Sequence, residues 1–120
     1  MKNKPLLYLI GSLKNDKIPQ LANQLNTNGI SVFSDWFAPG KDADDYWRDY
    51  EVARGRSYQE ALKGYAARNI FVFDQYHLNR AHGGLLVLPA GKSGHMELGY
   101  LSGQNKPVWL LYDKTPERYD

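Results

Sequence analysis

Glu97 has the sequence context best suited to chemistry. It follows a glycine-rich loop at 91–94, which comes directly after an apolar run at 83–89. Ser93 is a candidate N-cap, so the pattern predicts a helix that begins there and carries Glu97 in its first turn. The positive end of the helix dipole would help to keep this carboxylate ionised, as a nucleophile requires. An acid that only complements the dipole fits the same spacing, so both interpretations stay open.

Asp74 is a second carboxylate in an unusual position. It interrupts an apolar stripe, with four-residue spacing, on another predicted helix: Tyr58, Leu62, Ala66, Ile70 and Leu78. A carboxylate on a packing face costs free energy unless it is paired, hydrogen-bonded or protonated, and such positions are enriched in functional groups. Because the stripe drifts around the helix, a solvent-exposed Asp74 at its edge is the alternative.

Further candidates lie in the first apolar run, at 6–10, and in the turn directly after it. Tyr8 lies near its end, and Gly11 and Ser12 form the turn after it. A glycine lets a ligand approach the backbone, and a serine hydroxyl can bond to a sugar or a phosphate. The same pair is also common in turns that bind nothing.

Trp36 and Phe37 are adjacent in the next loop, at 34–40. Large aromatic side chains there could stack on a planar base. They could equally fold back as a lid on the core.

Gly94 and His95 complete the candidate set at the start of the Glu97 helix. Backbone amides at a helix start bind anions. His95 lies two residues from Glu97 and so points to a different helix face. It could contact substrate or a subunit partner, or be structural.

The elements that must position these residues alternate between strand and helix. Apolar runs at 6–10, 30–33, 83–89 and 107–112 predict buried strands. Helical periodicity predicts four helices. The first follows Asp16, the second runs from Asp42 to about Arg54, the third from the capping box at Ser57 through Ala81, and the fourth from Ser93 to Gly103.

Right-handed crossovers then make neighbouring strands parallel and gather the loops at their carboxyl ends, where such sheets bind ligands. We expect residues 1–120 to form one α/β domain. It should have three layers and a mostly parallel sheet of four or five strands, flavodoxin-like or Rossmann-like in its wrapping.

The composition excludes several classes of function. The 120 residues contain no cysteine, which rules out disulfides, thiolate catalysis and cysteine-ligated zinc. The three histidines lack a metal-site spacing, so we expect neither a metal nor a cofactor. A net charge of +2 does not favour a polynucleotide. The apolar run at 6–10 is too short for a signal peptide or a membrane span, so we expect a cytoplasmic protein.

The segment from Leu85 to Val108 resembles the signature of the nucleoside 2-deoxyribosyltransferases and of the related deoxynucleoside 5′-monophosphate N-glycosidases. The glutamate of the family's Met-Glu-Leu-Gly-Tyr motif is the nucleophile, which implies that role for Glu97. The stretch from Tyr8 to Ser12 is similar to the family's first strand end, whose tyrosine orients the nucleophile. The family's helical aspartate lies a little over twenty residues before the glutamate, which points to Asp74.

This resemblance implies cleavage or transfer at the N-glycosidic bond of a (deoxy)nucleoside. Glu97 would form a glycosyl ester through an oxocarbenium-like transition state, and Asp74 would protonate the departing base. A second base as acceptor makes the protein a transferase, and water makes it a hydrolase. The expected partners are therefore a nucleoside or nucleotide and a free nucleobase.

Two alternatives stay open beside the transferase. Serines in comparable loops of the monophosphate hydrolases bind the phosphate, so Ser93 is compatible with a 5′-phosphorylated substrate. A non-catalytic nucleotide-sensing module would keep the fold without the chemistry. The family forms dimers and higher oligomers, so we also expect a homo-oligomer.

Overall fold

Four parallel strands form the centre of the computed structural model, which describes residues 4–119. The strands are β1 (Leu6–Ile10), β2 (Ser31–Phe33), β3 (Gly83–Val87) and β4 (Val108–Leu111). They lie in the order β2-β1-β3-β4, with every neighbouring pair parallel. The expected α/β class with a parallel, flavodoxin-like sheet is confirmed.

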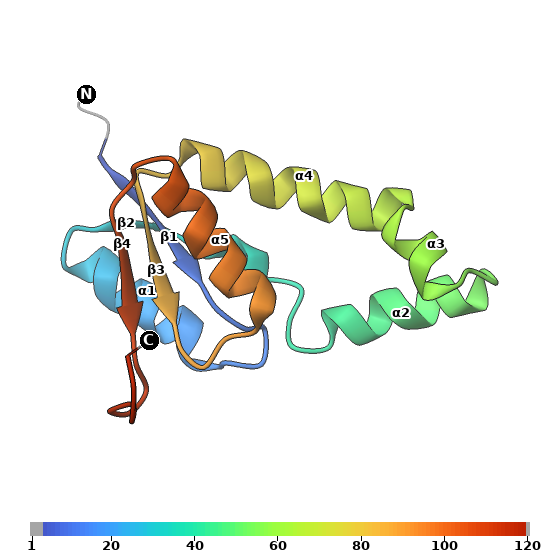
Figure 1. The fold of residues 1–120 in the computed structure, drawn as a ribbon, viewed down its shortest axis with the longest axis horizontal. Coiled ribbons are helices and arrows are strands. Elements are labelled where there is room, and N and C mark those ends of the chain that lie inside the picture. Colours follow the sequence, from blue (N-terminus) through green and yellow to red (C-terminus); the bar gives the residue numbers. More distant parts are fainter. Residues whose placement is uncertain (1–3, 120) are drawn as a thin grey trace.

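Helices cover both faces of this sheet (Figure 1). Helix α1 (Lys17–Thr27) packs Ile18 and Ala22 against Leu9 and Val87 on one face. On the other face, α4 (Tyr65–Arg80) and α5 (Lys92–Gly103) cover a second cluster. Its buried members are Tyr8, Ile10, Phe33, Leu78, Ala81, Leu86 and Leu101. The alternation of Tyr8, Leu9 and Ile10 between the clusters follows the two-residue period of a strand.

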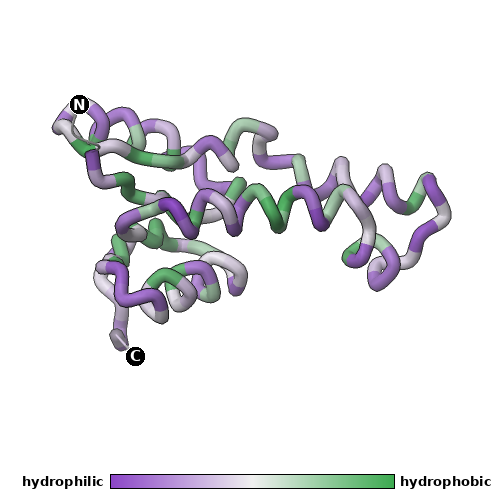
Figure 2. The backbone as a smooth tube through the Cα atoms, turned by 90° about the horizontal axis from the view of Figure 1, so that it is seen from above, coloured by the Kyte–Doolittle hydropathy of each residue, from purple (hydrophilic) through white to green (hydrophobic). Residues whose placement is uncertain are grey.

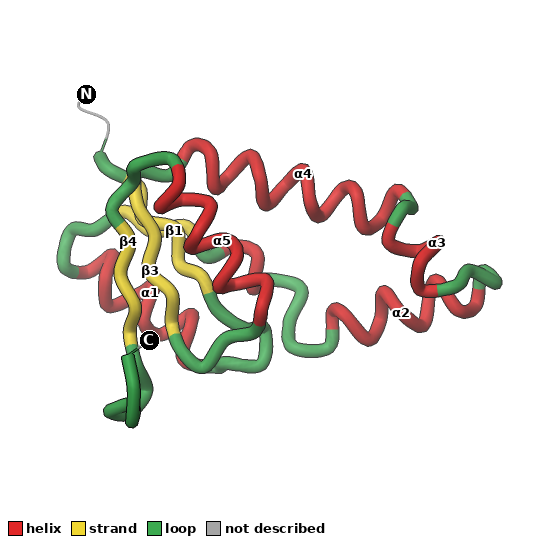
Figure 3. Tube along the Cα trace, in the orientation of Figure 1, coloured by secondary structure: helices red, strands yellow, loops and turns green. Residues whose placement is uncertain are grey.

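A helical arm extends beyond the sheet (Figures 1 and 3). It consists of α2 (Ala43–Ala53), α3 (Tyr58–Leu62) and the outer part of α4, and it follows the short 3₁₀ helix η1 (Asp35–Phe37). The arm makes the molecule extended, since its radius of gyration is 15.7 Å against about 13.6 Å for a compact chain of this length.

The prediction of one helix from 57 to 81 is wrong. The Ser57 capping box does form, with Glu60 N bonded to Ser57 Oγ at 3.1 Å and Ser57 N to Glu60 Oε1 at 3.0 Å. However, α3 ends at Leu62, and Gly64 takes an extended conformation as the N-cap of α4. Glycine favours this break because it is a poor helix former. Tyr58, Leu62 and Ile70 of the apolar stripe are exposed, since the arm leaves the core.

Asp16 and Asp42 are the N-cap residues of α1 and α2. Neither the Asp16 nor the Asp42 side chain bonds to its helix, because both residues lack the extended backbone that a capping side chain needs. At the start of α1, Asn15 Oδ1 instead accepts from Lys17 N at 3.1 Å.

Strand β4 lies at the edge of the sheet, where the sequence predicted a buried strand. Trp109, Leu110 and Leu111 are all exposed, because no described element pairs with the outer side of this strand. The buried run at 83–87 is confirmed.

None of the described helices is both long and apolar enough to span a membrane.

Candidate active site

A cavity of about 650 Å³ opens at the carboxyl ends of the strands. Its walls come from four segments: Tyr8, Gly11, Ser12 and Leu13 at the end of β1; Asp35, Trp36, Ala38, Pro39, Ala43 and Asp44 between η1 and α2; Ile70, Phe73 and Asp74 of α4; and Gly91, Ser93 and Glu97 around the start of α5. The cavity therefore brings together seven of the ten candidates named from the sequence.

Tyr8, Glu97 and Asp74 form an interacting trio in this cavity. The Tyr8 side chain is 2% exposed, and its hydroxyl donates a hydrogen bond to the Glu97 carboxylate. Burial and the two nearby carboxylates raise the pKa of Tyr8 well above its ordinary value, so it stays a proton donor. Tyr8 can hold its position because it lies in the central strand, with its ring 5.3 Å from that of Phe33.

Glu97 is not the first-turn acid that the sequence predicted. Gly91 is the N-cap of α5, and Ser93 is the second residue of the helix, with no capping bond from its side chain. Glu97 consequently lies in the second turn, where the dipole acts weakly. Burial and the charge of Asp74 raise its pKa, the Tyr8 hydrogen bond lowers it, and the net result is a pKa of about 7. The expectation that the helix start keeps Glu97 ionised is wrong, because Glu97 lies beyond the first turn and desolvation raises its pKa.

Asp74 is half-buried on α4, and burial raises its pKa. Leu78, one turn later, is in the core, whereas Ile70, one turn earlier, is exposed. Asp74 thus lies where α4 leaves the sheet and faces the cavity. A carboxyl group with a raised pKa in such a place is suited to proton transfer.

All four charged residues in the described lining of the cavity are acids. Asp35 and Asp44 add to Asp74 and Glu97. Sequence reasoning missed both, although Asp35 directly precedes Trp36 in a loop that follows a strand end. Four carboxylates disfavour an anionic group and favour a neutral ligand with hydrogen-bond donors.

Trp36 lines the cavity, and its position is fixed. Its Nε1 donates to Leu9 O at 2.7 Å, and its ring contacts both core clusters. Phe37 packs edge-on against Trp36, with ring centroids 5.9 Å apart, and on the α1 side of the core. Phe37 lies outside the described lining of the cavity.

Gly94 and His95 also lie outside that lining. Gly94 is buried, and a Cβ there would meet Leu86 Cδ1 at 3.2 Å and Ile10 Cγ2 at 3.3 Å. The glycine therefore lets α5 approach the sheet closely. His95 is exposed, and its Nδ1 lies 2.8 Å from Gly91 O, within hydrogen-bonding distance at the start of the helix.

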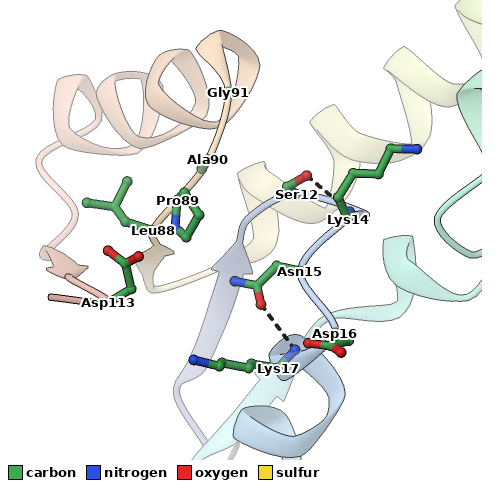
Figure 4. A pocket seen from close by; sticks show the side chains of 10 residues that line it. All are labelled: Ser12, Lys14, Asn15, Asp16, Lys17, Leu88, Pro89, Ala90, Gly91 and Asp113. Atoms are coloured by element: carbon green, nitrogen blue, oxygen red, sulfur yellow. Dashed lines mark hydrogen bonds between the residues drawn. The ribbon is translucent and has the colours of Figure 1, made fainter.

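A second cavity, of about 390 Å³, adjoins the first and shares Ser12 and Gly91 with it (Figure 4). Its charged lining residues are Lys14, Lys17, Asp16 and Asp113, so two cations are matched by two anions. Figure 4 shows the Lys14 side chain pointing away from Leu88 and Pro89.

A third hollow, of about 430 Å³, lies between α4 and α5 and shares Asp74, Ser93 and Glu97 with the first cavity. Phe71, Gln75, Leu78, Met96 and Tyr100 complete it. The Asp74 and Glu97 carboxyl groups therefore border two hollows.

Within residues 4–119, no group of three or more histidine, aspartate and glutamate side chains is arranged to hold a metal ion. Comparisons of the chain with protein-family models, with curated proteins and with solved structures found no significant match.

Proposed function

We propose that the protein transfers the sugar of a (deoxy)nucleoside between bases through a glycosyl ester on Glu97. The observation that carries this proposal is the trio of Tyr8, Glu97 and Asp74 in one cavity at the carboxyl ends of parallel strands. The resemblance of the Glu97 segment to the nucleoside 2-deoxyribosyltransferases assigns the same three residues to one reaction.

In the first half-reaction a Glu97 oxygen attacks C1′ and forms a C–O bond while the C1′–N bond breaks. The electron pair of that bond goes to the base nitrogen, which takes a proton from the Asp74 carboxyl group. The Tyr8 hydroxyl holds Glu97 in the attacking orientation. Trp36 offers a fixed aromatic face beside the base.

In the second half-reaction the acceptor base loses its proton to the Asp74 carboxylate and attacks C1′. The ester bond breaks, and its electron pair returns to Glu97. Water as acceptor follows the same path and releases free sugar. The acceptor alone thus separates transferase from hydrolase.

The charge of the cavity supports an unphosphorylated nucleoside. A 5′-phosphate would bring about two negative charges into a cavity that already holds Asp35, Asp44, Asp74 and Glu97. Ser12 and Ser93, which also line it, suit the neutral 5′-hydroxyl as hydrogen-bond partners.

Hydrolysis of a nucleoside 5′-monophosphate is the second candidate. The adjoining cavity with Lys14 and Lys17 begins at Ser12 and Gly91 and could accept a phosphate. Asp16 and Asp113 offset the two lysines there, which is why we rank this candidate second.

Chromatography of three incubations tests the proposal. The protein is given a deoxynucleoside with a second free base, the deoxynucleoside alone, and a deoxynucleoside monophosphate. We expect an exchanged nucleoside in the first incubation. Free base from the monophosphate without exchange would favour the hydrolase. Absence of turnover across a panel of bases would contradict both and favour a nucleotide-sensing module.

Glu97→Ala is the matched variant for these incubations. The proposal requires it to lose the activity, and full activity in this variant would contradict the mechanism. The homo-oligomer expected from the sequence belongs to the same proposal.

A further inference from the structure

We infer that His77 is a positioning residue, which holds Asp74 at its distance from Glu97 by stacking on Phe33. His77 lies on α4, three residues after Asp74 and on the same side of the helix. It lies outside the described lining of the cavity. The effect of His77 on the reaction rests on the proposed function, whereas its effect on the ionisation of Glu97 does not.

Phe33, the last residue of β2, joins the two halves of the site. On one side its ring packs against that of Tyr8, with centroids 5.3 Å apart, and Tyr8 donates a hydrogen bond to Glu97. On the other side the His77 ring stacks on Phe33, with centroids 3.9 Å apart and an angle of 15° between the ring planes. The Phe33 ring therefore sets the spacing between the Tyr8–Glu97 pair and the part of α4 that carries the proton donor.

Asp74 lies where α4 leaves the sheet, so the contacts beside it decide its position. The helix enters the core one turn later, whereas residues 70–73 directly before Asp74 are apolar and exposed. Figure 2 shows this apolar stretch in green and the hydrophilic residues that follow it in purple. Phe73 also contacts Phe33, but with ring centroids 6.0 Å apart, against 3.9 Å for His77. The His77 stack is the closer of the two ring contacts that hold this turn of α4 on the sheet.

Arg80 fixes the His77 ring in the stacked position. Its Nε donates to His77 Nδ1 at 2.8 Å, and its guanidinium carbon lies 5.4 Å from the centre of the Phe33 ring. Burial and the charge of Arg80 lower the pKa of His77, while the charge of Asp35 offsets this in part. The ring is therefore neutral at pH 7, and its Nδ1 can accept the bond from Arg80. A histidine here combines a flat ring for the stack with an acceptor that fixes the rotation of the ring.

Loss of the stack has a measurable consequence at Glu97. The charge of Asp74 raises the pKa of Glu97, so this pKa depends on the separation of the two carboxyl groups. If this turn of α4 moves away by about 2 Å, the pKa of Glu97 should fall by roughly half a unit. The proton donor would also be displaced from the departing base, which lowers the rate of bond cleavage.

A double-mutant cycle on the full chain tests the inference without any substrate. The pKa of Glu97 is followed by NMR of ¹³C-labelled carboxyl groups in the wild type, His77→Ala, Asp74→Asn and the double variant. We expect His77→Ala to lower this pKa by roughly half a unit. The same substitution should have no such effect when Asp74→Asn is already present, because the charge that it displaces is gone. His77→Phe, which keeps a flat ring on Phe33, should stay close to the wild type, and so should the control Val72→Ala, which shortens an exposed side chain of α4.

Arg80→Leu covers the case in which His77→Ala does not fold. It removes the hydrogen bond that fixes the His77 ring, so we expect the pKa of Glu97 to fall again. Loss of a cation by itself would raise the pKa of a carboxyl group, so a fall reports the displacement of Asp74. A Glu97 pKa that falls in neither variant would overturn the inference, and so would an equal fall with and without the Asp74 charge.

Activity measurements separate this inference from the proposed function. With a deoxynucleoside and a second free base, we expect His77→Ala to lower kcat by about tenfold with little change in KM, since Asp74 acts on the departing base rather than in binding. A Glu97 pKa that falls in His77→Ala, in a protein without turnover, supports the inference and contradicts the proposed function. Turnover together with a Glu97 pKa that His77→Ala leaves unchanged does the reverse.

Discussion

At the scale of single residues, the decisive feature is a carboxylate whose pKa is set by opposing neighbours. Burial and Asp74 raise the pKa of Glu97, while Tyr8 lowers it, and the result is about 7. Tyr8 and Asp74 therefore shift the pKa of Glu97 in opposite directions. Substitutions at these two positions should be distinguishable by the sign of their effect on pH dependence.

Removing the Tyr8 hydroxyl should shift the pH profile upward. In Tyr8→Phe, Glu97 loses a hydrogen bond that stabilises its charged form, so its pKa rises by about one unit. We expect the rise of kcat/KM near pH 7 to move to higher pH, with about a fivefold loss of activity at pH 7, because the ionised fraction of Glu97 falls from about one half to about one tenth. Tyr46→Phe, on the exposed side of α2, is the control. An unchanged profile would separate Tyr8 from the ionisation of Glu97.

Neutralising Asp74 should shift the same profile downward. Asp74→Asn removes the charge that raises the pKa of Glu97, so the midpoint of kcat/KM should fall below 7. The maximal rate should nevertheless drop by about 10²–10⁴-fold with bases that need protonation to leave. A large loss of rate with the midpoint still near 7 would show that Asp74 does not act on Glu97 electrostatically.

The ionised Glu97 side chain should also lower the free energy of unfolding at alkaline pH. Its pKa rises from 4.5 to about 7 on folding, so the folded state holds a proton that the unfolded state releases in this range. The free energy of unfolding contributed by this group therefore falls as the pH rises from about 4.5 to 7. Glu97→Gln should be more stable than the wild type by on the order of 2 kcal/mol at pH 8 and similar to it at pH 4. Urea unfolding at both pH values would detect the difference, and equal stabilities at pH 8 would contradict the burial of a charge at this position.

At the scale of elements, helices α4 and α5 position the site. α4 does so where it leaves the sheet, and α5 does so by packing closely on the sheet. α4 carries Asp74 at the point where the helix passes from the core to the arm. α5 brings Glu97 to Tyr8 because glycines at its contacts allow a close approach. A Cβ on Gly84 of β3 would collide with Leu101 Cδ1 of α5, and Gly94 of α5 faces Leu86 and Ile10.

Because α5 packs so closely on the sheet, adding one methyl group at this contact should strongly lower the stability of the fold. Gly84→Ala should lower the free energy of unfolding by about 1–3 kcal/mol, because overpacking a buried contact forces side chains off their rotamers. Gly99→Ala on α5 has open space around the new Cβ, so it should be neutral or stabilising by up to about 1 kcal/mol. Thermal denaturation of both variants provides the comparison, and equal midpoints would show that α5 can move away from the sheet at no cost.

The burial of a strand could be predicted from its apolar residues only where the strand has neighbours on both sides in the sheet. Strands β1 and β3 are buried and were identified as such, while β4 has the same apolar composition and lies exposed at the edge. Composition cannot separate these cases, because it does not record which strands have neighbours. The helix break at Gly64 had a visible signal in the glycine itself. The start of α5 at Lys92 had a weaker one, since Gly91 and Ser93 both suit an N-cap.

At the scale of the whole molecule, the site is assembled from segments far apart in the chain. Tyr8 and Glu97 could be grouped because the carboxyl ends of parallel strands and the loops after them meet at one edge of the sheet. Asp74 lies within a helix, and only the family resemblance joined it to them. Asp44 could not be assigned to the cavity, because it lies in α2 and its placement depends on how the arm folds. Asp35 had a visible signal, since it follows the end of β2. The exposure of Phe71 and Met96 was equally hidden, since apolar residues on a predicted helix indicate burial.

The most direct test of the account is to trap the glycosyl ester. The protein is mixed with a deoxynucleoside, quenched in acid and digested, and the peptides are compared by mass spectrometry with those of Glu97→Gln. We predict one added deoxyribosyl group on the peptide that contains Glu97, and its absence in the variant. Turnover without an adduct on any peptide, or an adduct on a different residue, would contradict the assignment of Glu97 as the nucleophile.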